Sequence, residues 1–400
     1  MKIKVGVIFG GESVEHEVSI ISAMGAICKM DNEKYDIIPI YIAKDREWYT
    51  GEALKDIEVY QDLDLMKRYA KNVVLYCKNG RFVLQTKRGL FKRVVADIDI
   101  AFPIVHGTNV EDGTLQGYLQ TIGIPYVGPD VYAAAVGQDK VFMKDIFASE
   151  KLPMTKYVWF YDSEYLEDNG KIMDDITKKL KFPVIVKPAL LGSSVGIHIA
   201  KDMAGLADAI DDAIQYDNKI LVEEVVPNLT EVNISVLGNY ENARVSEIEE
   251  VIPSEEFLTY EDKYIGQGKK GSKFGAKTSK GMLSTNRRIP ASIDDKLKEE
   301  VRKVALAAHR ALGSSGVSRI DFLVDNKAKK IYVNEVNSIP GSLAFYLWTP
   351  LGKDFSELLD DMINFGIKDY KRRISKTRSF KSNILQGFAN GMKGMKGKLK

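Results

Sequence analysis

The stretch SRIDFLVDNKAKKIYVNEVN, residues 318–337, has the alternating apolar pattern and polar centre of a β-hairpin. A turn near residue 328 would place Arg319 opposite Asn337 and Asp321 opposite Glu335. Successive side chains of a strand point to opposite faces, so these four lie on one face, at the end away from the turn. Both faces are otherwise rich in Ile, Phe, Leu and Val, which predicts a partly buried polar cluster.

Carboxylate and amide oxygens in this number are ligands that Mg²⁺ takes from a protein when phosphate oxygens complete its coordination. The hairpin therefore predicts a magnesium site formed by Asp321, Glu335 and Asn337, with Arg319 beside it. The alternative is an ion-paired sheet surface, which is the usual arrangement of charges on strands.

The beginning of the chain predicts a parallel sheet covered by helices. Buried strands are expected at residues 4–9, 35–43 and 97–105, and helical spacing at residues 15–30 and 112–122. The first strand ends in Gly10-Gly11, and a Ser/Glu-rich turn follows. Glu12 to Glu17 should therefore lie at the carboxyl end of the sheet, where open α/β sheets bind ligands.

Two further units are predicted downstream. The second contains helices near 130–150, 163–180 and 203–216, a hairpin within 182–201 and a strand at 220–225. The third contains two strands, a long polar loop at 254–288, a helix at 291–312, the hairpin and a last helix near 354–370. A loop of that length is typical of a lid or of a disordered segment. We predict an α/β fold with domains at residues 1–128, 129–230 and 231–370, followed by a basic tail at 371–400.

The segment FPVIVKPALLGSSVGIHIAK, residues 182–201, places Lys187 at a strand end, before a loop from Gly192 to Gly196. Backbone N–H groups and hydroxyls of such a loop can hold phosphate, and a lysine neutralises it. The alternatives are a plain hairpin turn and a hydrolase nucleophile elbow with Ser194. An elbow requires a helix after the serine, but the pattern there is that of a strand. The GQGKKG run at 266–271 lacks the preceding buried strand of a dinucleotide-binding motif.

Composition excludes several classes of protein. Residues 371–400 carry ten Lys/Arg and no Asp/Glu, which leaves 47 of the 57 basic residues against all 55 acidic ones in residues 1–370. A nucleic-acid-binding core is therefore not expected. No apolar run approaches the ~18 residues of a membrane span. We expect a cytoplasmic protein whose two cysteines, Cys28 and Cys77, are reduced and buried. The scattered histidines do not suggest zinc; His106 is the candidate for ligand contact, and His309 should be structural.

Seven motifs occur in order: FGGESVEHEVS (9–19), FPIVHGTNVEDGTLQGYLQTIGIPYVG (102–128), QDK (138–140), FPVIVKPALLGSSVGI (182–197), TYEDKY (259–264), RID (319–321) and NEVNSIPG (334–341). Together they resemble the D-alanine–D-alanine ligases of the ATP-grasp superfamily over residues 1 to about 370. The resemblance implies a Rossmann-like N-terminal domain followed by two subdomains that sandwich ATP. It also implies the joining of two D-alanines through an acyl phosphate, in peptidoglycan precursor synthesis, with two Mg²⁺ or Mn²⁺ ions.

The resemblance also assigns roles to residues. It implies that Glu15 binds the ammonium of the first amino acid beside His106, and that Arg319 and the N–H of Gly341 stabilise the tetrahedral intermediate. Glu15, Ser193 and Tyr264 would form a hydrogen-bonded trio that closes the site, and Asp321, Glu335 and Asn337 would bind the metal. The implied ATP contacts are Lys140, Lys187, the flap residues Gly192, Ser193, Ser194, Val195 and Gly196, the adenine hinge Glu223, Glu224, Val225 and Val226, the ribose ligand Glu231, and Lys263.

The sequence departs from the family in three places. The lid after Tyr264 is longer and more basic, and the tail is an addition. Tyr346-Leu347 stands where the family commonly has a Ser-Leu pair that holds the second substrate's carboxylate. Lys263-Tyr264 resembles the pair of D-alanine-using ligases rather than of depsipeptide-forming ones. The alternatives to D-alanyl-D-alanine synthesis are a related carboxylate–amine ligase with another acceptor and an inactive nucleotide-binding sensor. The resemblance further suggests a homodimer formed through the N-terminal unit.

Overall fold

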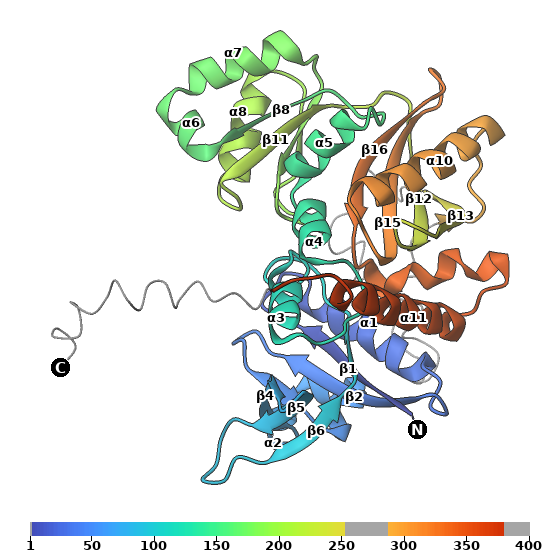
Figure 1. Ribbon diagram of the computed structural model, residues 1–400. Helices are drawn as coiled ribbons and strands as arrows, with labels where there is room; N and C mark the ends of the chain where they lie inside the picture. The colour runs from blue at the N-terminus through green and yellow to red at the C-terminus, as the bar shows by residue number, and fades with distance from the viewer. Residues whose placement is uncertain (1, 253–286, 380–400) are drawn as a thin grey trace, which may run out of the picture. The chain divides into compact units, whose positions relative to one another are not determined.

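Three β-sheets follow one another along the chain, and each is packed on its own hydrophobic core (Figure 1). The computed structural model describes residues 2–252 and 287–379. The mixed α/β architecture agrees with the predicted fold class. The domain boundaries themselves stay a prediction.

The first sheet has the strand order β6-β5-β4-β3-β2-β1-β7. Its strands are β1 (Ile3–Gly10), β2 (Tyr35–Ile42), β3 (Trp48–Thr50), β4 (Lys71–Lys78), β5 (Arg81–Thr86), β6 (Val94–Ile98) and β7 (Ile100–Pro103). Only β2, β1 and β7 are parallel, so the prediction of a parallel sheet is right for this part alone. The strands from β3 to β6 extend it in antiparallel order.

The single strand predicted at residues 97–105 is wrong, because the chain changes partners at Asp99. β6 pairs with β5, whereas β7 pairs with β1. The Asp99 carboxylate accepts the Lys4 N–H at 2.8 Å, and the Asp99 N–H donates to the Lys4 carbonyl at 2.8 Å. Since β6 and β7 stand at opposite ends of the strand order, the sheet curls back on itself.

The ligand end of the first sheet depends on a glycine turn. Gly10 has φ +90°, and a Cβ there would lie 2.2 Å from the Ile42 carbonyl oxygen. Only glycine fits, and the chain turns directly into α1 (His16–Lys29). The other helices of this region are η1 (Glu52–Lys55), η2 (Ile57–Gln61), α2 (Leu63–Tyr69) and α3 (Thr114–Ile122).

The predicted helix at 130–150 is divided into α4 (Val131–Gln138) and α5 (Lys140–Ser149). The cause is Asp139, whose carboxylate accepts from the N–H groups of Val141 and Phe142 and caps the second helix. The division places Lys140 in the first turn of α5.

The second sheet is antiparallel, with the order β10-β9-β11-β8. It consists of β8 (Tyr157–Tyr161), β9 (Val184–Pro188), β10 (His198–Ala200) and β11 (Lys219–Glu224), with the helices α6 (Asp162–Glu167), α7 (Asn169–Lys179) and α8 (Met203–Ala213). A strand follows Ser194, as predicted, which excludes the strand–turn–helix geometry of a nucleophile elbow.

The third sheet has the order β14-β13-β12-β15-β16 and is covered by α10 (Asp295–Ala311). Its strands are β12 (Leu229–Gly238), β13 (Ala243–Val251), β14 (Arg287–Arg288), β15 (Gly316–Asp325) and β16 (Lys330–Asn337). The predicted register is confirmed, with Arg319 opposite Asn337 and Asp321 opposite Glu335. A register shift follows Asp321, which the pattern did not predict.

The chain then forms η3 (Gly341–Leu347), η4 (Thr349–Leu351) and α11 (Phe355–Ile374). The residues of α11 before Lys368 return to the first core, where Leu358, Leu359 and Met362 are buried, and Asp360 binds Lys34 at 2.5 Å (Figure 1). Residues from Lys368 onward form a second unit.

The two cysteines are exposed, so their predicted burial is wrong. Cys28 lies near the end of α1, and Cys77 lies near the end of β4, past Val73 and Leu75, which are the buried side chains of that face. Both are free thiols.

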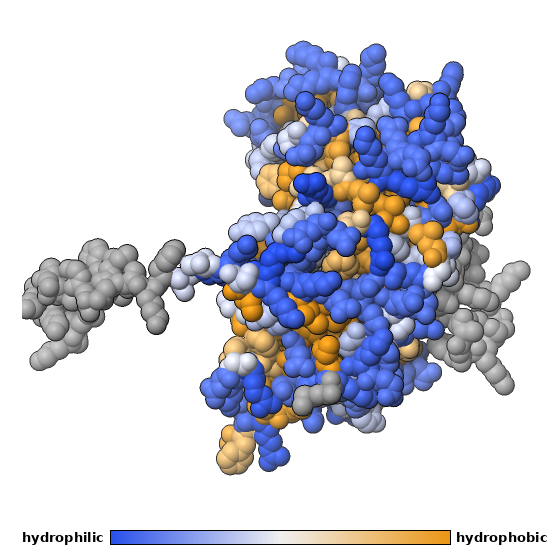
Figure 2. All heavy atoms as spheres, turned by 45° about the vertical axis from the view of Figure 1, so that its right-hand side comes forward, coloured by the Kyte–Doolittle hydropathy of each residue, from blue (hydrophilic) through white to orange (hydrophobic). Residues whose placement is uncertain are grey.

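Hydrophilic side chains cover most of the face in Figure 2. Among the described residues, none of the helices has the length and apolar character needed to cross a membrane.

Candidate functional site

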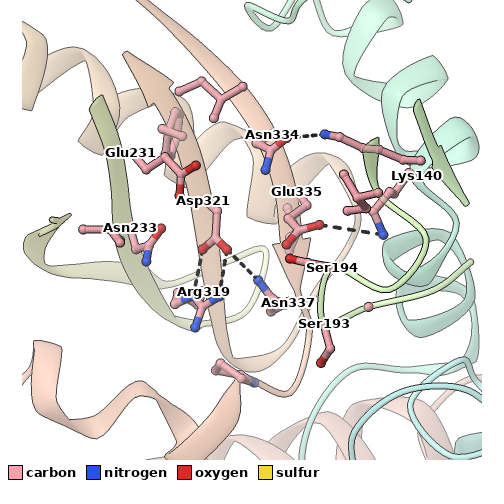
Figure 3. A pocket seen from close by; sticks show the side chains of 18 of the residues that line it. Lys140, Ser193, Ser194, Glu231, Asn233, Arg319, Asp321, Asn334, Glu335 and Asn337 are labelled. Carbon is pink, nitrogen blue, oxygen red and sulfur yellow. Dashed lines mark hydrogen bonds and ion pairs between the residues drawn. The ribbon is translucent and has the colours of Figure 1, made fainter. Parts of the chain in front are cut away.

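A cavity of about 390 Å³ is lined by residues from all three segments of the fold. It contains Glu15 and His106 from the first segment, and Lys140, Lys187 and the start of the Gly/Ser loop from the second. The third contributes the polar faces of β12, β13, β15 and β16. Figure 3 shows Asp321, Arg319, Asn337 and Glu335 converging on this space, with Asn233 and Glu231 on the neighbouring strand.

A row of polar side chains crosses the third sheet. Asn233 is the register partner of Glu249 on one side and of Asp321 on the other, and Asp321 is opposite Glu335. Directly opposed residues on one face have Cβ atoms ~4.5–5.5 Å apart. The cluster predicted from one hairpin is therefore part of a polar row over four strands, which runs Glu249–Asn233–Asp321–Glu335.

Arg319 and Asp321 form a bidentate ion pair, with Nε–Oδ1 and Nη2–Oδ2 distances of 2.7 Å each. Burial alone would lower the pKa of Arg319, but the adjacent Asp321 raises it well above its usual value. The Asn337 amide donates to Asp321 at 3.1 Å. The guanidinium is thus fixed in a charged state and held in one orientation.

The oxygen donors fit a magnesium ion that phosphate oxygens would complete. Asp321, Glu335 and Asn337 line the cavity from one face of the hairpin, and Mg²⁺ usually takes only one or two carboxylates from a protein. In the described ranges, there is no cluster of three His, Cys, Asp or Glu that could hold a metal by itself. Any metal here would depend on its ligand phosphates.

Two predicted lysines face the same end of the row. Lys140 Nζ lies 3.7 Å from Glu335 and donates to the Leu191 carbonyl at 2.6 Å. Lys187 Nζ lies 2.8 Å from Glu223 and 3.1 Å from the amide oxygen of Asn334. This end of the cavity therefore has the positive charge that a polyphosphate requires.

Glu223 is buried between two lysines. Its carboxylate lies 2.6 Å from Lys144 and accepts the Thr155 hydroxyl at 2.6 Å, in addition to its pairing with Lys187. Burial would raise the pKa of Glu223, but the two lysines lower it well below its usual value. Its side chain thus orients the lysines, while the predicted hinge residues Glu224, Val225 and Val226 also line the cavity.

The Gly/Ser loop reaches across to the first segment. The Ser193 hydroxyl donates to Glu15, so two members of the predicted trio are in contact. Ser193 and Ser194 adopt the left-handed region, with φ of +56° and +61°. Such backbone costs non-glycine residues about 1–2 kcal/mol each and is typical of functional loops.

Several predicted residues are not placed on the cavity. Tyr264 and Lys263, the predicted 254–288 lid up to residue 286 and the 266–271 run lie outside the described residues, whereas the last two residues predicted for the lid form β14. Val195 and Gly196 complete the loop without lining the cavity, whereas Glu231 and Gly341 do line it. Leu347 is fully buried and does not line the cavity. Its neighbour Tyr346 lines the cavity.

His106 has a defined tautomer. Its Nδ1 lies 2.8 Å from the Ile339 carbonyl, which only accepts, so Nδ1 carries the proton. Burial lowers the pKa of His106, and its Nε2 accepts from the Ser22 hydroxyl at 3.0 Å. Ser22 in turn accepts the Ser342 N–H at 2.9 Å. His106 therefore supports the turn at residues 342–344, where all three residues have positive φ.

The comparisons with known proteins agree with this geometry. The family model described as D-ala D-ala ligase N-terminus matches residues 4–129, and the one described as D-ala D-ala ligase C-terminus matches residues 146–364. The chain belongs to the D-alanine–D-alanine ligase family.

Individual relatives align with nearly the whole length of this chain. A D-alanine–D-alanine ligase of Thermosipho melanesiensis is 40% identical over 96% of this chain and 98% of its own. The crystal structure of VanG D-Ala:D-Ser ligase from Enterococcus faecalis has 30% identity and a TM-score of 0.74, over 92% of this chain and 100% of its own. A D-alanine–D-alanine ligase of Bacillus anthracis, complexed with ATP, has 25% identity and a TM-score of 0.64, over 93% and 99% of the two chains.

Sequence reasoning missed several cavity residues of this ligase-family fold. Asn233 and Glu249 could have been found by continuing the hairpin register onto the preceding strands. Arg287 gave no signal, since it lies at the end of the predicted 254–288 loop and its strand is only two residues long. Glu111, Thr155 and Asn334 also line the cavity and were assigned no role in advance. The same is true of Ser22 and Lys144, which do not line it but contact His106 and Glu223.

Proposed function

We propose that the protein is an ATP-dependent ligase that joins two D-alanines into D-alanyl-D-alanine, ADP and phosphate, for peptidoglycan precursor synthesis. The observation that carries the proposal is the polar row, in which Glu335 lies 3.7 Å from Lys140 and Asp321 holds Arg319, in a cavity that Gly341 also lines. ATP would bind among Lys140, Lys187, Glu231 and the hinge at residues 223–226. Because the reaction consumes ATP, we place the enzyme in the cytoplasm.

The first step is activation of a carboxylate that is too poor an electrophile to react with an amine. Glu15 would hold the ammonium of the first D-alanine beside His106, and the carboxylate would attack the γ-phosphate of ATP to give an acyl phosphate and ADP. Lys140 and Lys187 would neutralise the phosphates, and the N–H groups of the Gly192–Gly196 loop would cover the transferred group. Two Mg²⁺ ions bound at Asp321, Glu335 and Asn337 would add charge neutralisation.

The second step is attack of the second D-alanine's amine on the acyl carbon. Arg319, charged and oriented by Asp321, would stabilise the developing oxyanion together with the Gly341 N–H. Donors placed in this way contribute about 10²–10³-fold in rate each. Collapse of the tetrahedral intermediate then expels phosphate. The contact of Ser193 with Glu15 closes the loop over the site, which would exclude water from the acyl phosphate.

The test is phosphate release with Mg-ATP over a panel of D- and L-amino acids, with mass spectrometry of the products. We expect turnover that depends on D-alanine and a D-alanyl-D-alanine product. Absence of both would refute the substrate assignment. A better product with another acceptor would favour a related ligase, an outcome that Tyr346 and the similarity to a D-Ala:D-Ser ligase make worth including. Light scattering of the same sample tests the proposed homodimer.

A further inference from the structure

The two ends of the polar row lie in different surroundings. Glu335 lies near Lys140, on the side of the proposed phosphate site. Glu249, at the other end, contacts Arg287 and Tyr346. If phosphoryl transfer takes place at the Glu335 end and Arg319 stabilises the intermediate next to it, the attacking amino acid enters from the Glu249 end. This argument rests on the proposed function.

Glu249, Arg287 and Tyr346 form one unit, here called the acceptor cluster. Arg287 Nε lies 3.0 Å from Glu249, and the Tyr346 hydroxyl donates to the same carboxylate at 3.2 Å. The Arg287 guanidinium lies 4.8 Å from the centre of the Tyr346 ring. Burial raises the pKa of Tyr346 to about 12, so the hydroxyl stays protonated and can donate.

Exposure indicates which charge a ligand of this cluster would carry. The Glu249 side chain is 1% exposed, whereas that of Arg287 is 20% exposed. Both residues line the cavity, but the guanidinium is the group that a ligand can reach. A planar guanidinium matches a carboxylate, to which it can offer two parallel N–H donors.

We propose that Arg287 binds the carboxylate of the second amino acid. Glu249 fixes the guanidinium through Nε, and the Tyr346 ring supports its plane. The Asn233 side-chain amide lies 3.4 Å from Glu249 on the neighbouring strand and places a further polar group beside the buried carboxylate. In this chain, Arg287 thus binds the carboxylate that a Ser-Leu pair commonly holds in the family. Tyr346-Leu347 occupies the position of that pair.

The test compares the native enzyme with Arg287→Gln, using D-alanine and D-alaninamide as acceptors. Loss of a charged hydrogen-bond partner typically weakens binding about ten- to hundredfold. We expect the KM for the second D-alanine to rise by that factor, with the KM for ATP unchanged. The native enzyme should strongly prefer D-alanine to D-alaninamide, which lacks the carboxylate, and the variant should lose this preference.

Hydroxylamine separates this role from damage to the rest of the site. It traps the acyl phosphate as a hydroxamate and has no carboxylate for Arg287 to bind. We expect Arg287→Gln to form D-alanyl hydroxamate at the native rate, and Arg287→Lys to recover part of the acceptor affinity. A fall in hydroxamate formation equal to the loss of dipeptide would show a general structural role and overturn the proposal.

The neighbouring arginine supplies a matched control. Arg288 is 52% exposed and pairs with Glu250 at 3.2 Å, away from the cavity lining. Arg288→Gln should leave both KM values unchanged. An unchanged acceptor KM in Arg287→Gln, in an enzyme that makes the dipeptide, would overturn this inference alone. A native enzyme that makes no dipeptide from D-alanine would instead contradict the proposed function.

Discussion

Glu111 shows how burial changes the chemistry of a single residue. Its carboxyl group is buried and accepts from the Gly107 N–H at 3.0 Å, the Ile339 N–H at 2.9 Å and the Ser338 hydroxyl at 3.1 Å. Burial, together with the nearby Glu15, nevertheless raises its pKa from 4.5 to about 7. Glu111 thus connects the loop after β7 with the segment before Gly341 in a state that depends on pH.

The raised pKa predicts that Glu111 makes the protein less stable as pH rises from 4.5 to 7. In that range the folded state holds a proton that the unfolded state has released, so the free energy of unfolding falls with pH, by about 3 kcal/mol in total. Above pH 7 the contribution is constant. Thermal unfolding of the native protein and of Glu111→Gln across this range tests the prediction. The difference between their melting temperatures should change with pH; a constant difference would contradict it.

Replacing the carboxylate of Glu335 and replacing that of Asp321 should have different effects on activity and stability. Glu335→Gln removes a proposed metal ligand whose carboxylate lies 3.7 Å from Lys140 Nζ. We expect phosphate release to fall at least about a hundredfold with little loss of stability. Asp321→Asn leaves the partly buried Arg319 without its counter-ion and should also destabilise the fold, by at most about 3–5 kcal/mol.

Activity and urea denaturation of both variants test this pair of predictions, with the exposed Glu241→Gln as a control for the loss of one negative charge. Equal destabilisation by the two site variants would mean that Arg319 does not depend on Asp321. Normal turnover by Glu335→Gln would remove Glu335 from the metal site.

At the scale of elements, a hydrogen bond to helix α1 holds the turn at residues 342–344 in place. Ser342, Leu343 and Ala344 all have φ near +50°, a backbone that costs each of them about 1–2 kcal/mol. The Ser342 N–H donates to Ser22, which lies on α1 and also donates to His106. Helix α1 thus positions the turn that follows Gly341, the proposed oxyanion donor.

Ser22→Ala should therefore damage the turn and the site together. It removes the acceptor of Ser342 N–H and leaves Nε2 of the buried His106 without its donor, at a cost of about 1–3 kcal/mol. We expect a lower melting temperature and a reduced kcat. Ser22→Thr, which keeps the hydroxyl, is the control and should retain more of both. Equal loss in the two variants would point to packing at this position rather than to the hydrogen bonds.

The elements that could be predicted from the sequence are those whose causes lie within one short stretch of chain. The register of the 318–337 hairpin was correct because alternation and turn position fix it within one stretch. The mixed first sheet was missed because β6 and β7 are contiguous in sequence but pair with different strands. The break at Asp139 was missed because the apolar pattern continues on both sides of a capping residue. Glu249 and Arg287 reach the site only because their strands pair with distant strands, and no local sequence pattern predicts that pairing.

At the scale of the molecule, the site depends on segments far apart in the chain. Glu15 and His106 come from the first segment, the lysines and the Gly/Ser loop from the second, and Arg319 and the proposed metal ligands from the third. The part of α11 before Lys368 then returns to the first core. Folding of the site therefore requires the chain to extend at least through this part of α11. The match to the C-terminal family model ends at residue 364, within the same helix.

Truncation after Ile374 should consequently leave the ligase rate within about twofold. The deleted residues 375–400 carry seven Lys/Arg and no Asp/Glu, and they lack the apolar pattern of a packed element. Truncation after Asp354 is the contrasting variant, because it removes the buried Leu358, Leu359 and Ile363, each worth about 2–5 kcal/mol when truncated. Phosphate release and melting temperature should be native-like in the first and lost in the second. Collapse of activity in the shorter deletion, with an unchanged melting temperature, would mean that the basic tail acts on the reaction itself.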